Sequence, residues 1–113
     1  MISYLSAKNV YDIWASECEC MEVLDFRSIS SIQSSRIPGT NNLSPKDISI
    51  KTFLEDQNKV FVLIEAPAEL VSEVSKHSEV DNVFIIDGGL GSWVDAGYPL
   101  APLVIEKGRS QNV

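Results

Sequence analysis

Two short segments made only of apolar residues limit the folds open to this chain more than any other feature. They are Val60–Ile64, with the sequence Val-Phe-Val-Leu-Ile, and Val83–Ile86, with the sequence Val-Phe-Ile-Ile. Neither segment alternates with polar residues, and both are rich in the β-branched and aromatic residues that favour strands. Strands that are apolar on both faces are typical of a parallel sheet covered by helices on both sides. The two segments therefore predict an α/β fold.

Helical patterns fill the chain around these two segments. Ser6 is followed by apolar residues at helical spacing, which indicates a capped helix. Ser44 and Pro45 are typical of a helix start, because Pro is favoured at the first helical position. The other expected elements are helices over residues 7–17, 45–55, 67–77 and 90–96, a strand over residues 21–26 and a helical turn over residues 29–32. Alternating strands and helices predict right-handed crossovers and a mostly parallel sheet.

The charge balance narrows the partners that such a chain can bind. Nine Lys and Arg residues stand against sixteen Asp and Glu residues, which gives a formal net charge of −7. Nucleic acids and anionic membrane surfaces are bound through cationic patches, so neither is expected as a partner. A length of 113 residues suits one domain, expected over residues 1–105 and followed by a polar, flexible tail over residues 106–113.

Compartment and cofactors are also constrained by the sequence. No apolar run is long enough to span a membrane, and the first residues lack the basic start and apolar core of a secretory signal. The chain has two cysteines, Cys18 and Cys20, which are expected to be reduced in such a protein. We therefore expect a cytoplasmic protein without a cofactor or a metal, and the sequence leaves its oligomeric state open.

Five short motifs lie in register between residues 3 and 100. The residues that form them are Asp25, Arg27, Arg36, Ile37, Pro38, Gly39, Asn82, Val83, Gly88, Gly89, Trp93, Gly97 and Pro99. In this order, and with Asn42 at the end of the stretch that begins at Arg36, they resemble the rhodanese-like domain. That domain typically has Asp-x-Arg after an early strand, then His-Ile-Pro-Gly-Ala-x-Asn, Asn-Val, Gly-Gly-x-x-x-Trp and Gly-x-Pro. The resemblance implies a central, mostly parallel five-stranded sheet with helices on both faces.

Each motif also has a structural interpretation that needs no activity. Asp25 and Arg27 are two residues apart at a strand end, so they are expected to form an ion pair. The Pro-Gly pair at residues 38–39 is a turn signal. The Gly-Gly pair at residues 88–89 allows a sharp turn from strand to helix, and Trp93, one helical turn later, is expected to pack into the core.

The segment after the central strand departs from the family. In rhodanese-like sulfurtransferases this strand ends in a cysteine that opens a Cys-x-x-Gly-x-Arg-Ser loop, because a thiolate must attack a sulfane sulfur and hold it as a persulfide. The family's cysteine position falls here on Ile64 or Glu65, and the connection is two or three residues shorter. The corresponding loop consists of Glu65, Ala66, Pro67, Ala68, Glu69 and Leu70. The resemblance therefore implies the family's scaffold with a degenerate active-site loop.

Charge in the second half of the chain agrees with this interpretation. Residues 65–95 include seven acids and a single base, Lys76. An anion such as thiosulfate gains little from such surroundings. A carboxylate of Glu65 or Glu69 over the following helix N-terminus is expected to fill the anion site of the loop. Arg36 stands where the family commonly has a histidine, and the one histidine of the chain, His77, is expected to be solvated at a helix end.

The preferred hypothesis is a rhodanese-like protein-binding or regulatory module without sulfurtransferase activity. Its contact surface is expected at the carboxyl edge of the sheet, over residues 25–30, 36–41, 65–70 and 87–91, where ligands bind in open α/β sheets. An acidic rim there suits a basic protein partner.

The alternative is a sulfurtransferase or sulfur carrier for thiosulfate or a persulfide, which would use Cys18, Cys20 or a cysteine of a partner. These two residues follow a helix and precede a strand, so they are expected at the opposite edge of the sheet. Their glutamate neighbours are expected to raise a thiol pKa. Phosphatase-like chemistry needs the same missing thiolate.

Overall fold

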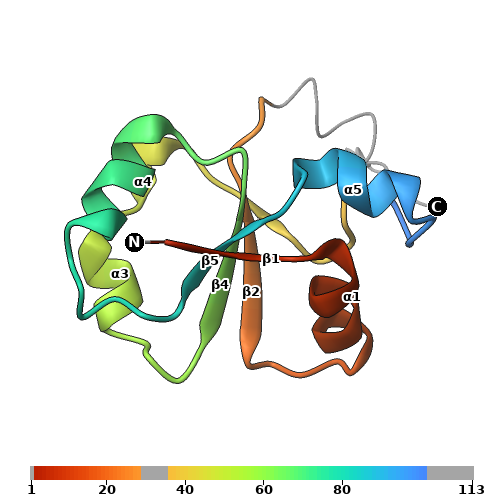
Figure 1. The fold of residues 1–113 in the computed structure, drawn as a ribbon, viewed down its shortest axis with the longest axis horizontal. Helices are drawn as coiled ribbons and strands as arrows, with labels where there is room; N and C mark the ends of the chain where they lie inside the picture. The colour runs from red at the N-terminus through yellow and green to blue at the C-terminus, as the bar shows by residue number, and fades with distance from the viewer. Residues whose placement is uncertain (1, 29–35, 102–113) are drawn as a thin grey trace, which may run out of the picture.

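Five parallel strands form a single sheet in the order β1-β5-β4-β2-β3 (Figure 1). A computed structural model describes residues 2–28 and 36–101. The strands are β1 (Ser3–Leu5), β2 (Met21–Asp25), β3 (Asn41–Asn42), β4 (Val60–Ile64) and β5 (Val83–Ile86). The α/β fold and the five-stranded parallel sheet expected from the sequence are confirmed. The helical turn expected over residues 29–32 and the tail over residues 106–113 lie outside the described residues.

The apolar segment Val60–Ile64 is the central strand, as its composition predicts. It pairs with β2 from Met21 opposite Val60 to Asp25 opposite Ile64, and with β5 on its other side. Residues 62–64 have no exposed surface. A continuous apolar run suits this place because helices cover both faces of the strand.

Among the described residues, two pairs of helices cover the sheet, one pair on each face (Figure 1). The elements are α1 (Ala7–Ala15) and α5 (Gly89–Asp95) on one face, and α3 (Ile50–Leu54) and α4 (Ala68–Ser75) on the other. Ser6 begins α1 as expected, because its Oγ accepts a hydrogen bond from the backbone N–H of Asn9 at 3.1 Å. Each face has its own apolar core, built around Phe53, Phe61 and Leu63 under α3 and α4, and around Val62, Ile64 and Trp93 under α1 and α5.

The prediction of a single helix over residues 45–55 is wrong. The structure has a 3-10 helix at Pro45–Asp47 and then the separate helix α3. Ile48 lies between them in an extended conformation, with φ −137° and ψ 148°. The break lets the half-buried side chains of Ile48 and Ile50 both pack against the core around Phe53. Packing thus overrides the helix-start signal of Ser44, which makes no side-chain cap.

Strands β1 and β3 were not located by the sequence pattern. They are three and two residues long and lie at the two edges of the sheet. Segments this short have too few residues to show the alternation of apolar and polar residues by which a strand is recognised. Within residues 2–28 and 36–101, no helix has the length and apolar character needed to cross a membrane.

Asn82 explains the Asn-Val motif structurally. Its buried side-chain amide donates to the carbonyl oxygens of Phe53 at 3.3 Å, Asp56 at 3.2 Å and Lys59 at 3.0 Å. The carbonyl oxygens of Phe53 and Asp56 also accept backbone hydrogen bonds from Asp56 and Lys59, so the Asn82 amide adds a second donor at the end of α3 and in the turn before β4. Asn82 therefore fixes the entry into the central strand.

Candidate functional site

The carboxyl ends of the five parallel strands lie along one edge of the sheet, the upper edge for β2 and β4 in Figure 1. The segments that follow β2, β4 and β5 therefore lie there, and they include residues 25–28, 65–70 and 87–91 of the expected surface. Residues 36–40 instead precede β3 and lead into its amino end, because β3 runs parallel to β2. Residues 29 and 30, also expected on this surface, lie outside the described part of the chain. We call this region the carboxyl edge.

Asp25 and Arg27 form the expected ion pair at the end of β2. The Arg27 guanidinium donates through Nε to both carboxylate oxygens at 3.0 Å and through Nη2 to Oδ2 at 2.9 Å. The backbone N–H of Arg27 donates to Asp25 Oδ1 at 3.0 Å. The Asp25 side chain is fully buried and the Arg27 side chain is 7% exposed. The pair thus organises the strand end from within.

Asn42, the last residue of the motif that begins at Arg36, closes the same corner. Its side-chain amide donates to the carbonyl oxygens of Asp25 at 2.7 Å and Arg27 at 3.0 Å. Asn42 belongs to β3, the edge strand beside β2. The motif resemblance covers Asn42, but it does not indicate which groups its side chain contacts.

Arg36, Pro38 and Gly39 lie in a fixed segment before β3. The backbone of Arg36 makes two hydrogen bonds of 2.9 Å with Ala101, and its Nη1 donates to the carbonyl oxygen of Thr40 at 3.4 Å. Gly39 has φ +86°, a conformation that favours glycine, and this confirms the expected turn. Trp14 Nε1 donates to the carbonyl oxygen of Pro38 at 2.9 Å and so ties the turn to α1.

The loop between β4 and α4 has only three residues, 65–67. Glu65 is exposed and has φ +53°, so the chain turns sharply directly after the strand. Pro67 is the N-cap residue of α4 and makes no side-chain cap. Since proline has no N–H, one of the three loop residues cannot donate to an anion.

Glu69 lies in the first turn of α4, where its charge is favourable to the helix dipole. Neither the Glu65 nor the Glu69 carboxylate makes a hydrogen bond with any residue in the described part of the chain. Glu69 therefore lies in the first turn of α4 but makes no direct hydrogen bond to the helix N-terminus. Glu65 is exposed to solvent.

The Gly-Gly pair and Trp93 have structural roles, as expected. Gly88 and Gly89 have φ +79° and +63°, and a Cβ on Gly88 would lie 2.9 Å from Ser92 Cβ. Trp93 is fully buried, and its Nε1 donates to the carbonyl oxygen of Pro99 at 2.7 Å. This bond ties the closing Gly-x-Pro motif to α5. The Gly-Gly-x-x-x-Trp motif thus builds the corner of the carboxyl edge that follows β5.

His77 follows α4 and contacts two glutamates. Its Nδ1 is 3.2 Å from Glu79 Oε2 and its Nε2 is 3.5 Å from Glu73 Oε2. Two hydrogen bonds lower the pKa of the Glu79 carboxyl. The larger effect comes from the backbone N–H of Glu79 itself, and the smaller from the side chain of His77. The side chain of His77 is 37% exposed, and its partners place it in a surface charge cluster.

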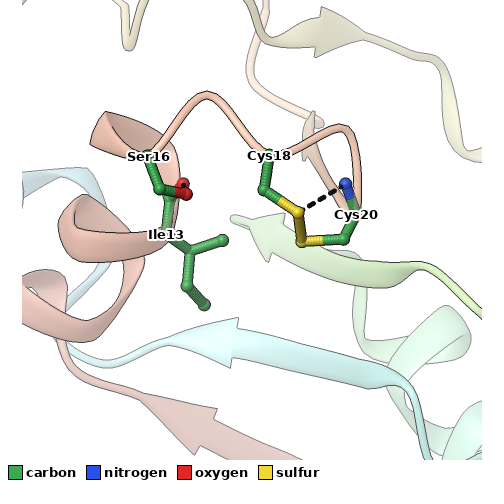
Figure 2. The surroundings of a disulfide bond; sticks show 4 residues. All are labelled: Ile13, Ser16, Cys18 and Cys20. Atoms are coloured by element: carbon green, nitrogen blue, oxygen red, sulfur yellow. Dashed lines mark hydrogen bonds between the residues drawn. A yellow bond between two sulfur atoms is a disulfide. The ribbon is translucent and has the colours of Figure 1, made fainter.

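Cys18 and Cys20 form a disulfide, contrary to the expectation of two reduced thiols (Figure 2). They lie between α1 and β2, and the carbonyl oxygen of Cys20 accepts a 2.7 Å hydrogen bond from Val60 at the start of β4. The pair is therefore at the amino edge of the sheet, as the topology predicts, and not at the carboxyl edge. Within the described residues, no group of three His, Cys, Asp or Glu side chains is placed to hold a metal ion.

A parallel sheet in this strand order, with two helices on each face and loops gathered at the carboxyl edge, defines the rhodanese-like fold. A rhodanese-related protein from Thermoplasma volcanium is 21% identical to this chain with a TM-score of 0.64, and the match covers 88% of this chain and 97% of that one. The rhodanese-like domain of an Anabaena protein is 17% identical with a TM-score of 0.63, and the match covers 100% of this chain and 92% of that one.

A thiosulfate sulfurtransferase from Pseudomonas aeruginosa is also similar. It is 24% identical with a TM-score of 0.64, and the match covers 90% of this chain but only 20% of that enzyme. Comparisons with protein-family models and with curated proteins found no match. At these identities the likeness is one of fold.

Proposed function

We propose that this chain is a rhodanese-like module that lacks sulfurtransferase activity and binds a basic protein partner at its carboxyl edge. The observation that carries the proposal is the three-residue loop after β4, in which Glu65 takes the place directly after the strand. The loop contains no cysteine, serine or threonine. Sulfur transfer in rhodanese-like enzymes needs a nucleophile on this loop.

The electrostatics of the loop also oppose a persulfide or a bound anion. A persulfide needs several backbone N–H donors directed at one point and a favourable local charge. Pro67 removes a donor, and the exposed carboxylates of Glu65 and Glu69 add negative charge on either side of it. The Arg27 guanidinium is engaged by Asp25, so this nearby cation already has a buried counter-charge.

The same features suit a cationic partner. Glu65, Glu69 and Asp87 are exposed residues that follow the carboxyl ends of the neighbouring strands β4 and β5. Lys46 and Lys51 line the same pocket as Glu69 and offset part of this negative charge. An excess of exposed charge of one sign on a rigid edge accelerates association with an oppositely charged surface, and salt weakens the effect. The proposal therefore includes an association rate that falls as ionic strength rises.

Sulfurtransferase activity is the first test. We expect the purified, reduced chain to release no thiocyanate from thiosulfate and cyanide above a blank without protein. The matched control is the Cys18→Ser/Cys20→Ser double variant, which should give the same flat trace. Turnover by the natural chain that is lost in the double variant would refute the proposal in favour of a sulfur carrier that uses these cysteines.

Binding at the carboxyl edge is tested with a basic probe peptide of alternating Lys and Ala residues. We expect its addition to shift the amide NMR signals of residues 65–69 and 87–91, and the affinity to fall roughly tenfold in a Glu65→Gln/Glu69→Gln/Asp87→Asn variant, because each exposed charge pair contributes up to about 1 kcal/mol. The control variant Glu17→Gln/Glu19→Gln removes two exposed charges at the amino edge and should leave the affinity unchanged. Equal losses in both variants would show that only net charge matters.

A further inference from the structure

The Cys18–Cys20 disulfide lies on the amino edge, on the opposite side of the sheet from the surface proposed above. The bond is in the loop between α1 and β2, with Ile13 and Ser16 of the end of α1 beside it (Figure 2). Cys18 is exposed and Cys20 is half-buried. Both sulfur atoms thus belong to residues that solvent can reach. We propose that this pair is a thiol–disulfide exchange site whose substrates are cationic or uncharged thiols.

The bridge contributes little to holding the fold, which is the first argument. It joins residues only two apart, and the stabilisation gained by restricting the unfolded chain is least for the shortest loops. Both flanks are anchored without it. Ser16 Oγ donates to the carbonyl oxygen of Ile13 at 2.6 Å, the backbone N–H of Glu17 donates to that of Trp14 at 3.1 Å, and Cys20 O accepts from Val60. Opening the bond therefore leaves α1 and β2 in place.

The second argument is a hydrogen bond to sulfur. The backbone N–H of Cys20 donates to Cys18 Sγ at 3.1 Å (Figure 2). The neighbouring glutamates disfavour a thiolate on either cysteine, but this donor stabilises negative charge on Cys18 Sγ relative to Cys20 Sγ, and the more stabilised thiolate is the better leaving group. Cys18 is accordingly the sulfur that leaves when the bridge opens, and the one that closes it again.

Each reduction of the protein disulfide consumes two small thiols, which leave as one small disulfide. A thiolate attacks Cys20 Sγ, forms a mixed disulfide with it and expels Cys18 as a thiolate. A second thiolate attacks the sulfur of the bound thiol, releases the oxidised small disulfide and leaves Cys20 as a thiolate. Two electrons pass from the thiols to the protein pair, and the two protein thiolates take protons from water. In reverse, the dithiol reduces a small disulfide.

Charge around the pair sets the substrate class. Glu17 and Glu19 are exposed and flank Cys18 in the sequence, so two negative charges lie within one residue of the bridge along the chain. An anionic thiol is repelled on approach, whereas a cationic thiol is attracted. Salt screens both effects.

The test uses the full, oxidised chain and two small thiols, cysteamine and 3-mercaptopropionate. The rate at which each thiol opens the protein disulfide is divided by the rate at which the same thiol reacts with an uncharged small disulfide. Opening is followed by alkylation and mass spectrometry. We expect cysteamine to react roughly tenfold faster than 3-mercaptopropionate at low salt, with the ratio approaching one at 1 M salt. We also expect the ratio to fall in Glu17→Gln/Glu19→Gln, and the far-UV circular dichroism to stay unchanged after reduction.

A Cys18→Ser variant supplies an independent readout. Without the resolving sulfur, Cys20 should accumulate a mixed disulfide with cystamine, whereas the natural reduced chain should return to the internal bridge. A bridge that reacts only after unfolding in urea, a loss of structure on reduction, or equal normalised rates for the two thiols would each overturn the proposal. None of these outcomes bears on binding at the carboxyl edge, which is tested separately.

Discussion

Replacing Asp25 by Ala is expected to lower the free energy of unfolding by about 3–5 kcal/mol, because it removes the buried carboxylate that compensates the Arg27 charge. The Asp25 side chain has no exposed surface and accepts four hydrogen bonds from Arg27, three from the guanidinium and one from the backbone N–H. A typical domain is stable by roughly 5–15 kcal/mol, so the loss takes a large part of the total. Urea unfolding followed by circular dichroism measures it.

The Lys8–Asp12 pair gives a matched control. Lys8 Nζ is 2.8 Å from Asp12 Oδ2, as short as the buried pair, but the two side chains are 73% and 53% exposed. Asp12→Ala should therefore cost no more than about 0.5 kcal/mol. If the two variants lost equal stability, burial would not be what makes the Asp25 pair important.

A second variant separates charge from position. Asp25→Leu/Arg27→Met removes both charges and keeps apolar volume, a change that is often neutral in buried pairs. We expect it to recover part of the stability lost in Asp25→Ala. No recovery would indicate that the hydrogen bond to the Arg27 backbone N–H, rather than the buried charge, fixes the strand end.

The sheet and its site could be predicted from the sequence because their signals are local. The apolar runs of β4 and β5 identify buried strands directly, and the chain order of strands and helices then assigns each loop to one edge of the sheet. That order alone places the loop at Glu65 and the cysteines at residues 18 and 20 at opposite edges of the sheet. The absence of cysteine, serine and threonine from residues 65–70 is likewise visible in the residue types.

The details that depend on partners far along the chain could not be predicted. The hydrogen bonds of Trp14 to Pro38 and of Asn42 to Asp25 join residues 24 and 17 positions apart. The break at Ile48 follows from packing against the core, which local helix signals do not report. The Cys18–Cys20 bond depends on the conformation of a short loop in which Glu17 has φ +58°, a conformation that residue type does not reveal for glutamate.

Trp93→Ala is expected to cost about 3–5 kcal/mol, the usual loss for a buried tryptophan truncated to alanine. Trp93 has no exposed surface and packs in a cluster with Tyr11, Trp14 and Tyr98, whose ring centroids lie 5.9, 5.7 and 5.1 Å from its own. Truncation opens a cavity that these rings cannot fill by small shifts, since their positions are also fixed elsewhere: Tyr11 stacks on Tyr98 at 4.2 Å, and Trp14 bonds to Pro38.

The hydrogen bond of Trp93 adds a second, separable loss. Trp93→Phe keeps most of the buried ring but leaves the carbonyl oxygen of Pro99 without the indole donor, so we expect a loss of roughly 1–3 kcal/mol. Val94→Ala, on the same helix and 43% exposed, should change stability by less than about 0.5 kcal/mol. With a urea m-value of roughly 1–3 kcal/mol/M, the alanine variant at Trp93 should lower the unfolding midpoint by more than about 1 M. A midpoint like that of Val94→Ala would mean that the cluster does not hold α1 and α5 together, and that the Gly-Gly-x-x-x-Trp motif has a role other than building this core.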